Sequence, residues 1–228
     1  MTSMRALVLN RQTNLSQVKE RMQFREKQHG VLSLSSVNLP SVETLDAMQT
    51  ELSRSSCAVV GANAALLGCR HTADICKHDI VIHVNQHPKL LSLCPRVDIQ
   101  IINAFVCTTS DCVIKPRLFR LRHEWNPRQI ALYSKHAWLA TGTEGLYVRD
   151  VLTKRIAKGR CCPSAGGIAA SFALHACKHT TLYGLGARNV SYVDDANKQA
   201  SNSVHDFASE FQWYMYMRDY QHVQMRCY

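Results

Sequence analysis

The sequence predicts an α/β fold with a mostly parallel sheet flanked by helices. Apolar runs that suit buried strands alternate along the chain with helical stretches, and two of the connecting turns are rich in small residues. Continuous apolar strands are typical of sheets covered on both faces, and strands that alternate with helices are typical of parallel architectures. A length of 228 residues allows one sizeable core and leaves little room for a second, so we expect a single domain.

The first strand, turn and helix unit begins with residues 57–61 (CAVVG), an apolar run that ends in Gly61. A helix start follows, and residues 79–85 (DIVIHVN) predict a second strand. A turn of this kind can present backbone N–H groups to a nucleotide. The residues after Gly61 are Ala62 and Asn63, so the three-glycine dinucleotide fingerprint is absent.

A second unit follows in residues 162–183. Residues 162–167 (CPSAGG) predict a turn that leads into an apolar helix over residues 168–177 and a strand over residues 180–183. Ser164 is placed to cap this helix, where unpaired backbone donors and the helix dipole stabilise a phosphate or carboxylate. A simple helix cap after a proline is the structural alternative, and the two roles are compatible.

Outside these two units, the sequence predicts further helices and strands. Residues 41–52 predict a short helix, with Pro40, Ser41 and Glu43 suited to its start. The other predicted elements are strands over residues 97–103 and 129–133 and a helix over residues 143–157.

The chain is strongly basic. Lys and Arg outnumber Asp and Glu by 27 to 17, which gives a formal net charge of +10 and favours an anionic partner. A nucleic acid is not expected, because no known module of interleaved basic and aromatic residues is present. No apolar window reaches the length of a membrane span.

Ten cysteines are more than an ordinary cytosolic enzyme carries and favour a few disulfides in a secretory compartment. Residues 1–30 contain no signal-peptide or anchor pattern, so two expectations stay open: a piece of a longer precursor, or a protein that works where thiols are reduced. No Cys-x-x-Cys spacing and no paired carboxylates near the turns occur, so neither zinc nor another divalent cation is expected.

Four segments, in one order, resemble the motifs of the sialyltransferase family. Residues 57–85 match the large motif, residues 163–186 the small motif and residues 191–194 the third, and His205 with Glu210 matches the last. The resemblance implies the sialyltransferase-like variant of the GT-A, Rossmann-like nucleotide-sugar transferase fold. It places the catalytic domain in residues 53–228 and leaves residues 1–52 as an N-terminal accessory or linker segment.

The resemblance implies an inverting glycosyltransferase that moves sialic acid, or a related acidic sugar such as Kdo, from a CMP donor to a glycan hydroxyl. It further implies work in the Golgi lumen without a metal or other cofactor. The residues that it assigns to the donor site are Gly61, Asn63, Asn85, Ser164, Ala165, Gly166 and Tyr192. A plain turn is the alternative role for Asn85, and a core aromatic is the alternative for Tyr192.

The resemblance also implies a disulfide between Cys57 and Cys177 that holds the two turns in register. Cys69 and Cys227 are a further candidate pair. The other six cysteines have no assignable partner from the sequence.

By the same resemblance, His205 is the catalytic base, since an imidazole with a pKa of about 6.5 can accept a proton near pH 7. The residues alone also suit a histidine that opens a helix, because Phe207 and Phe211 follow at helical spacing. Glu210 is expected to orient His205 or the local backbone, and a solvated helix residue is the alternative.

Two departures from the family pattern keep other functions open. Ala62 stands where the family often has Asn, and Ser191 stands where it usually has His. These changes favour an alternative, a catalytically impaired relative that binds a glycan or nucleotide. An unrelated nucleotide-cofactor enzyme or oxidoreductase is the second alternative.

Overall fold

The computed structural model describes residues 40–85, 88–101, 164–186, 205 and 207–228. It also describes the backbone of four short strands: β4 (Leu118–Phe119), β5 (Trp138–Leu139), β7 (Ser191–Tyr192) and β8 (Asp195–Gln199). The predicted strand over residues 129–133 and the predicted helix over residues 143–157 lie outside the described residues.

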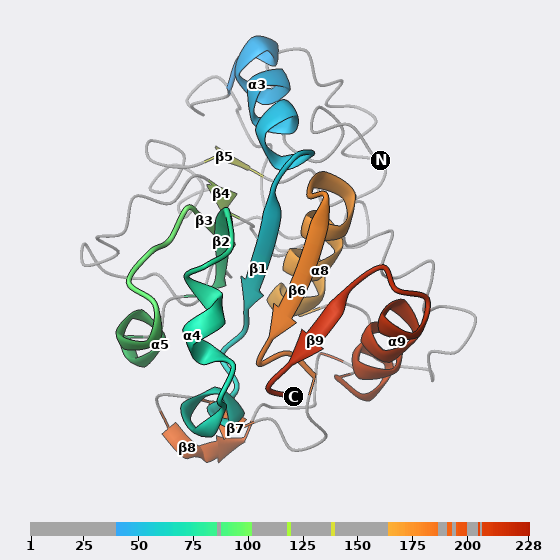
Figure 1. Ribbon diagram of the computed structural model, residues 1–228. Coiled ribbons are helices and arrows are strands. Elements are labelled where there is room, and N and C mark those ends of the chain that lie inside the picture. The colour runs from blue at the N-terminus through green and yellow to red at the C-terminus, as the bar shows by residue number, and fades with distance from the viewer. Residues whose placement is uncertain are drawn as a thin grey trace, which may run out of the picture.

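Five parallel strands form the central sheet. They are β1 (Ser56–Val60), β2 (Ile80–Val84), β3 (Ile99–Ile101), β6 (His179–Tyr183) and β9 (Gln224–Arg226), and their order across the sheet is β3-β2-β1-β6-β9. From β1 the chain winds outward through β2 and β3, and later outward on the other side through β6 and β9 (Figure 1). The winding therefore reverses between β1 and β6, which is where open α/β sheets bind their ligands.

The predicted α/β fold is confirmed, and four of its strands were predicted, including β3 within the predicted strand over residues 97–103, because their residues are mostly buried. All five residues of β2 are buried, as are four of the five in β1 and in β6. β9 was not predicted. It is a three-residue edge strand in which only the central Met225 is buried, so it leaves no apolar run.

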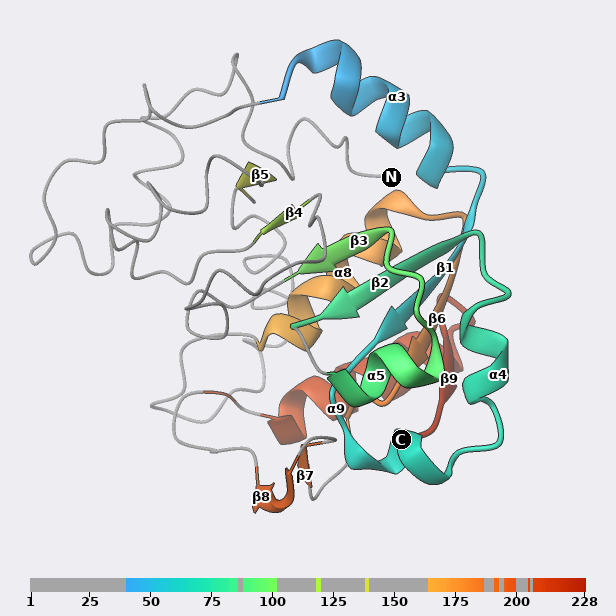
Figure 2. The ribbon, with the colours of Figure 1, turned by 90° about the vertical axis from the view of Figure 1, so that its left-hand side faces the viewer.

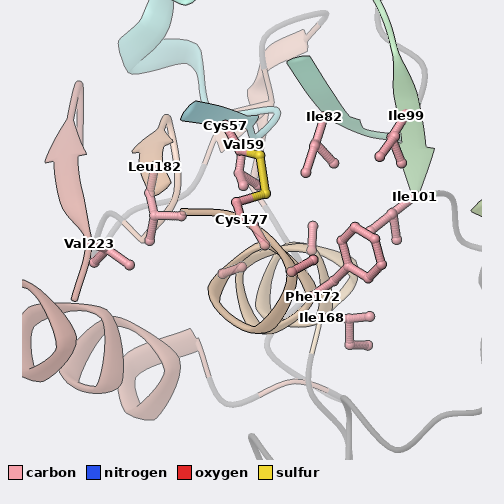
Figure 3. Close-up of a cluster of buried hydrophobic side chains, with 14 of the residues drawn as sticks. Cys57, Val59, Ile82, Ile99, Ile101, Ile168, Phe172, Cys177, Leu182 and Val223 are labelled. Atoms are coloured by element: carbon pink, nitrogen blue, oxygen red, sulfur yellow. A yellow bond between two sulfur atoms is a disulfide. The ribbon is translucent and has the colours of Figure 1, made fainter. Parts of the chain in front are cut away.

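Helices cover both faces of the sheet (Figures 1 and 2). One face packs against α8 (Ala165–Ala176), α9 (Phe207–Asp219) and α3 (Val42–Leu52). The other face packs against the 3₁₀ helix η3 (Ala64–Gly68), α4 (Thr72–Ile75) and α5 (Pro88–Leu93). Figure 3 shows the first of these interfaces, where Ile168 and Phe172 of α8 lie beneath Val59, Ile82 and Ile101 of the strands.

The predicted helix over residues 41–52 is α3, and Ser41 caps it. The Ser41 hydroxyl accepts a hydrogen bond from the Thr44 N–H at 3.3 Å. Leu45 and Leu52 are fully buried in the same cluster as α8, so α3 contributes to the core of the sheet. A domain boundary after residue 52 stays a prediction.

Three disulfides join the described cysteines: Cys57–Cys177, Cys69–Cys227 and Cys76–Cys94. The first pair and the candidate second pair are confirmed, whereas no partner could be assigned to Cys76 or Cys94 from the sequence. All cysteines within the described part of the chain are paired.

The position of the Cys57–Cys177 bridge differs from the expectation. Cys57 lies near the start of β1 and Cys177 caps the end of α8 (Figure 3). Gly61 follows the end of β1, and Gly166 and Gly167 lie in the first turn of α8, so the bridge joins the opposite ends of both elements. It fixes α8 against the sheet from the far side and does not hold the turns directly.

Candidate functional site

The two glycine-bearing segments converge at the switch point of the sheet. The Gly61 N–H donates to the Tyr183 carbonyl at 2.8 Å, and a Cβ on Gly61 would lie 2.4 Å from the Gly184 carbonyl oxygen. The Leu185 side chain would meet a Cβ on Gly61 at 2.5 Å and a Cβ on Gly166 at 2.8 Å. The end of β1 and the start of α8 therefore both contact the segment that follows β6.

Gly184 lets the chain leave β6 at this point. Its φ of 61° lies in the left-handed region, which glycine adopts without a steric penalty. A Cβ there would also lie 2.5 Å from a Leu66 methyl group of η3. The close approach of η3 to the carboxyl end of β6 therefore depends on glycine at this position.

Asn63 lies directly after the Gly61 turn and is 3% exposed. Its Oδ1 accepts a hydrogen bond from the Ala65 N–H at 2.9 Å and so caps η3. Its Nδ2 has no hydrogen-bond partner among the described residues. A buried donor without a partner costs about 1–3 kcal/mol, so this amide is suited to an acceptor on a bound ligand.

Asn85 follows the end of β2, beside β1, and its backbone has a φ of 59°. Its N–H donates to the Ile101 carbonyl at 2.9 Å, and its carbonyl accepts from Gln100 Nε2 at 3.0 Å. The sequence placed Asn85 at a strand end, and the structure adds that β3 binds both polar groups of its backbone.

Ser164 is the N-cap of α8, and its hydroxyl accepts from the Gly167 N–H at 3.1 Å. The helix begins at Ala165, so the prediction of a turn through residue 167 was wrong for Ala165, Gly166 and Gly167. Both glycines lie in the first helical turn. A Cβ on Gly167 would lie 3.1 Å from the Glu210 carboxylate, which explains a small residue where glycine otherwise weakens a helix.

Glu210, in the first turn of α9, is only 3% exposed and binds the start of α8. Its carboxylate accepts hydrogen bonds from the Ser164 hydroxyl at 2.7 Å, from the Ser164 N–H and from the Tyr214 hydroxyl at 3.4 Å. Burial, followed by the Glu210 charge, raises the pKa of Tyr214 well above its usual value, so its phenol keeps its proton. Glu210 is thus a buried link between two helices and not a solvated residue.

His205 lies two residues before α9 and is 9% exposed. Its ring contacts that of Phe207 in an edge-on arrangement, with 5.6 Å between the ring centroids. The histidine therefore lies at the start of the helix whose first turn carries Glu210. Its catalytic role stays a prediction.

Tyr192 is part of β7, which pairs antiparallel with β8. Both strands lie beyond the carboxyl ends of β1 and β6 (Figures 1 and 2). The Tyr192 side chain lies outside the described residues, so its place in the donor site stays a prediction.

His78 and Tyr183 form a link that the sequence did not reveal. The two were assigned to different motifs, yet His78 Nε2 lies 3.0 Å from the Tyr183 hydroxyl. Burial lowers the pKa of His78 and raises the pKa of Tyr183 to about 12. Both shifts favour the neutral forms of the two groups, and the bond joins the segment between α4 and β2 to the end of β6.

Two further properties bear on function. Among the described residues, no cluster of His, Cys, Asp or Glu side chains is arranged to hold a metal ion. Within the same part of the chain, no helix combines the length and apolar character needed to cross a bilayer.

A parallel sheet whose winding reverses beside two glycine-bearing segments defines an α/β protein with a candidate nucleotide site at the switch point. The sequence model of glycosyltransferase family 29 (sialyltransferase) matches residues 89–221. That range is more than half of the chain, so the chain belongs to this family and is a glycosyltransferase. The match contains the small, third and last motifs, and the large motif precedes it.

Two solved structures share the fold. One is a mammalian sialyltransferase in complex with Gal-beta-1-3GalNAc-ortho-nitrophenol, with a TM-score of 0.73, 18% identity, and coverage of 99% of this chain and 91% of that one. Another structure of a mammalian sialyltransferase has a TM-score of 0.67 and 14% identity over the same shares of the two chains. A search of curated protein sequences found no match.

Proposed function

We propose that this glycosyltransferase moves sialic acid, or a related acidic sugar such as Kdo, from a CMP donor to a glycan hydroxyl with inversion at the anomeric carbon. The observation that carries the proposal is the convergence of both glycine-bearing segments at the switch point, beside Asn63 Nδ2, which has no partner within the described part of the chain. A nucleotide in this place would supply the acceptor that the buried amide lacks.

Asn63 and Asn85 follow neighbouring strands and are suited to the cytidine or ribose, together with the backbone at Gly61. At the start of α8, the N–H and the hydroxyl of Ser164 are bound by Glu210, which leaves the backbone N–H groups of Ala165 and Gly166 for a ligand. The nearby Glu210 carboxylate opposes a second anion there. We therefore assign these N–H groups to an uncharged part of the nucleotide, and Tyr192 to the phosphate.

His205 is the proposed base. It takes the proton of the acceptor hydroxyl while that oxygen attacks the anomeric carbon of the sugar, and the bond from this carbon to the CMP phosphate oxygen breaks. The electron pair of that bond leaves with CMP. We propose that the transfer needs no metal ion, because a histidine and hydrogen-bond donors supply both the base and the stabilisation of the leaving group.

The three disulfides support a place in the secretory pathway, in agreement with the family, because such bonds persist in oxidising compartments. We propose the Golgi lumen as the site of action. The first relative was crystallised with Gal-beta-1-3GalNAc-ortho-nitrophenol, so a galactose-ended disaccharide is a suitable first acceptor to assay.

Binding is tested by thermal unfolding with CMP, UDP and NAD, each in excess. A ligand at 100 times its Kd stabilises the folded state by about 2.7 kcal/mol, so CMP should raise the Tm by several degrees. Stabilisation by NAD but not by CMP would overturn the donor assignment and favour a nucleotide-cofactor enzyme.

Catalysis is tested with CMP-sialic acid and CMP-Kdo. His205→Ala should lower kcat by about 10²–10⁴ and keep CMP binding, the usual loss for a general base. His222→Ala is the matched control, because His222 is exposed in the turn after α9. Turnover that survives in His205→Ala would reassign the base.

A catalytically impaired binder is the second candidate. Ala62 and Ser191 occupy positions that the family usually fills with polar contacts. This candidate predicts CMP-induced stabilisation without transfer to any acceptor or hydrolysis of either donor.

A further inference from the structure

Gln100 is an amide in an otherwise apolar strand. It lies in β3 between Ile99 and Ile101, all three residues are buried, and Gln100 is 3% exposed. A buried amide is costly unless its polar atoms are used. The Nε2 of Gln100 is used for one bond, 3.0 Å long, to the backbone carbonyl of Asn85.

The carbonyl that Gln100 binds belongs to a residue in an uncommon conformation. Asn85 has a φ of 59°, in the left-handed region that side chains other than glycine adopt at a cost of about 1–2 kcal/mol. Asn is among the residues that enter this region most easily, but it also populates ordinary β conformations. A fixed left-handed conformation at the end of a strand therefore needs support from its surroundings.

That support comes from β3 at two points. The Asn85 N–H donates to the Ile101 carbonyl, and the Asn85 carbonyl accepts from Gln100, so both polar groups of the backbone are held by one strand. Gln100 is in register with His83, and its side chain reaches two residues forward along β2. Backbone pairing supplies the first bond, and only a donor of this length supplies the second.

We propose that Gln100 is a positioning residue for the donor site. By binding the carbonyl of Asn85 it keeps that residue left-handed, and this sets the direction in which the Asn85 side chain leaves the backbone. The inference rests on the proposed function, in which Asn85 contacts the nucleotide. It adds a residue outside the four family motifs to the machinery that binds CMP.

The test compares three variants by calorimetric titration with CMP and by thermal unfolding. Gln100→Met keeps the length of the side chain and removes the donor, and it should weaken the Kd for CMP about tenfold. Asn85→Gly permits a positive φ without the side-chain amide and should weaken binding at least as much. In the Asn85→Gly background, Gln100→Met should change the Kd less than twofold.

Gln224→Met is the matched control, because Gln224 is exposed on the edge strand β9 and should leave the Kd unchanged. If Gln100→Met is too unstable to titrate, Gln100→Leu makes the same test with a side chain suited to a strand.

A lower Tm with an unchanged Kd in Gln100→Met would overturn the inference, since it would show a structural role alone. A loss of affinity that persists in the Asn85→Gly background would also overturn it, because the effect would not pass through Asn85. Failure of the wild-type protein to bind CMP would instead overturn the proposed function and this inference with it.

Discussion

Replacing Glu210 by Gln removes the charge from the carboxylate that joins α8 to α9. Glu210 accepts from the Ser164 hydroxyl, the Ser164 N–H and the Tyr214 hydroxyl. An uncharged amide keeps one oxygen acceptor and places an NH₂ group toward the remaining donors. We expect the variant to fold with the same helices and a weaker contact between them.

The magnitude follows from the hydrogen bonds that are lost. A hydrogen bond to a charged group contributes about 1.5–3 kcal/mol, so Glu210→Gln should lower the free energy of unfolding by about 2 kcal/mol. For a chain of this size, that loss corresponds to a Tm lower by about 4–8 °C. Ser164→Ala should lose about 3 kcal/mol, because its hydroxyl also caps α8 through the Gly167 N–H.

The two substitutions remove the same hydroxyl–carboxylate bond, so their effects should not add. The double variant should be more stable than the sum of the single losses predicts, by about 1–2 kcal/mol. Urea unfolding monitored by circular dichroism gives all four free energies. Glu51→Gln, on the exposed side of α3, is the matched control and should change stability by less than about 0.5 kcal/mol.

Additive losses in this cycle would refute the argument, as would a Glu210→Gln variant as stable as the control. Either result would mean that the contact between Glu210 and Ser164 contributes nothing to the joining of the two helices.

Three further predictions concern packing, pH and the disulfide. Gly61→Ala places a methyl group 2.4 Å from a backbone oxygen and should cost about 3 kcal/mol or more in a urea melt, whereas Gly68→Ala has open space and should be neutral or slightly stabilising. Burial lowers the pKa of His78 in the folded state, so its contribution to stability is present above the unfolded value of about 6.5 and is lost as pH falls through the folded value. The Tm of the wild type should therefore fall more between pH 7.5 and 5.5 than the Tm of His78→Gln. Replacing Cys57 and Cys177 by Ala opens a link across 120 residues and should cost about 5 kcal/mol in the chain-entropy model, measured by urea unfolding.

Each of these three predictions would be contradicted by a specific result. Equal stabilities of the two glycine variants would contradict the close approach of the turn after β1 to the segment after β6. Parallel pH curves for the wild type and His78→Gln would contradict the assigned shift. If the variant without Cys57 and Cys177 has a free energy of unfolding within about 1 kcal/mol of the wild type, this bridge constrains the unfolded chain little.

Strands of the sheet could be predicted where burial requires a continuous run of apolar residues. Strands β1, β2 and β6 are covered on both faces, and each gives an apolar run that indicates a strand without knowledge of its neighbours. β9 lies at the sheet edge with two exposed residues and gives no such run.

The start of α8 shows how tertiary contacts override a local pattern. Ser-Ala-Gly-Gly predicts a turn because glycine weakens helices. In the structure Ala165, Gly166 and Gly167 are helical, because the Ser164 cap is bound by Glu210 and the same carboxylate fills the space beside Gly167. Glu210 and the residues at the start of α8 are visible in the sequence, but the contact between them is not.

The candidate site likewise contains features that were predicted from the sequence and contacts that were not. The turn at Gly61 and the cap at Ser164 were predicted from residue type and local position, and Asn63 was assigned to the donor site from the family resemblance. The bond from Gln100 to Asn85 and the bond from His78 to Tyr183 were not predicted, because each joins residues that are far apart in the sequence and meet only in the folded sheet.

By itself the sequence determined the strands β1, β2, β3 and β6, the turn at Gly61 and the order of the family motifs, since each of these depends on neighbours within a few residues. Only the tertiary structure decided that β6 lies beside β1, that Glu210 reaches Ser164 across 46 positions of chain, and that β3 holds Asn85 in a left-handed conformation. The reason is that a hydrogen bond between distant residues depends on the order of the strands and the placement of the helices. The same local elements can be arranged in many ways, and each arrangement would bring different residues into contact.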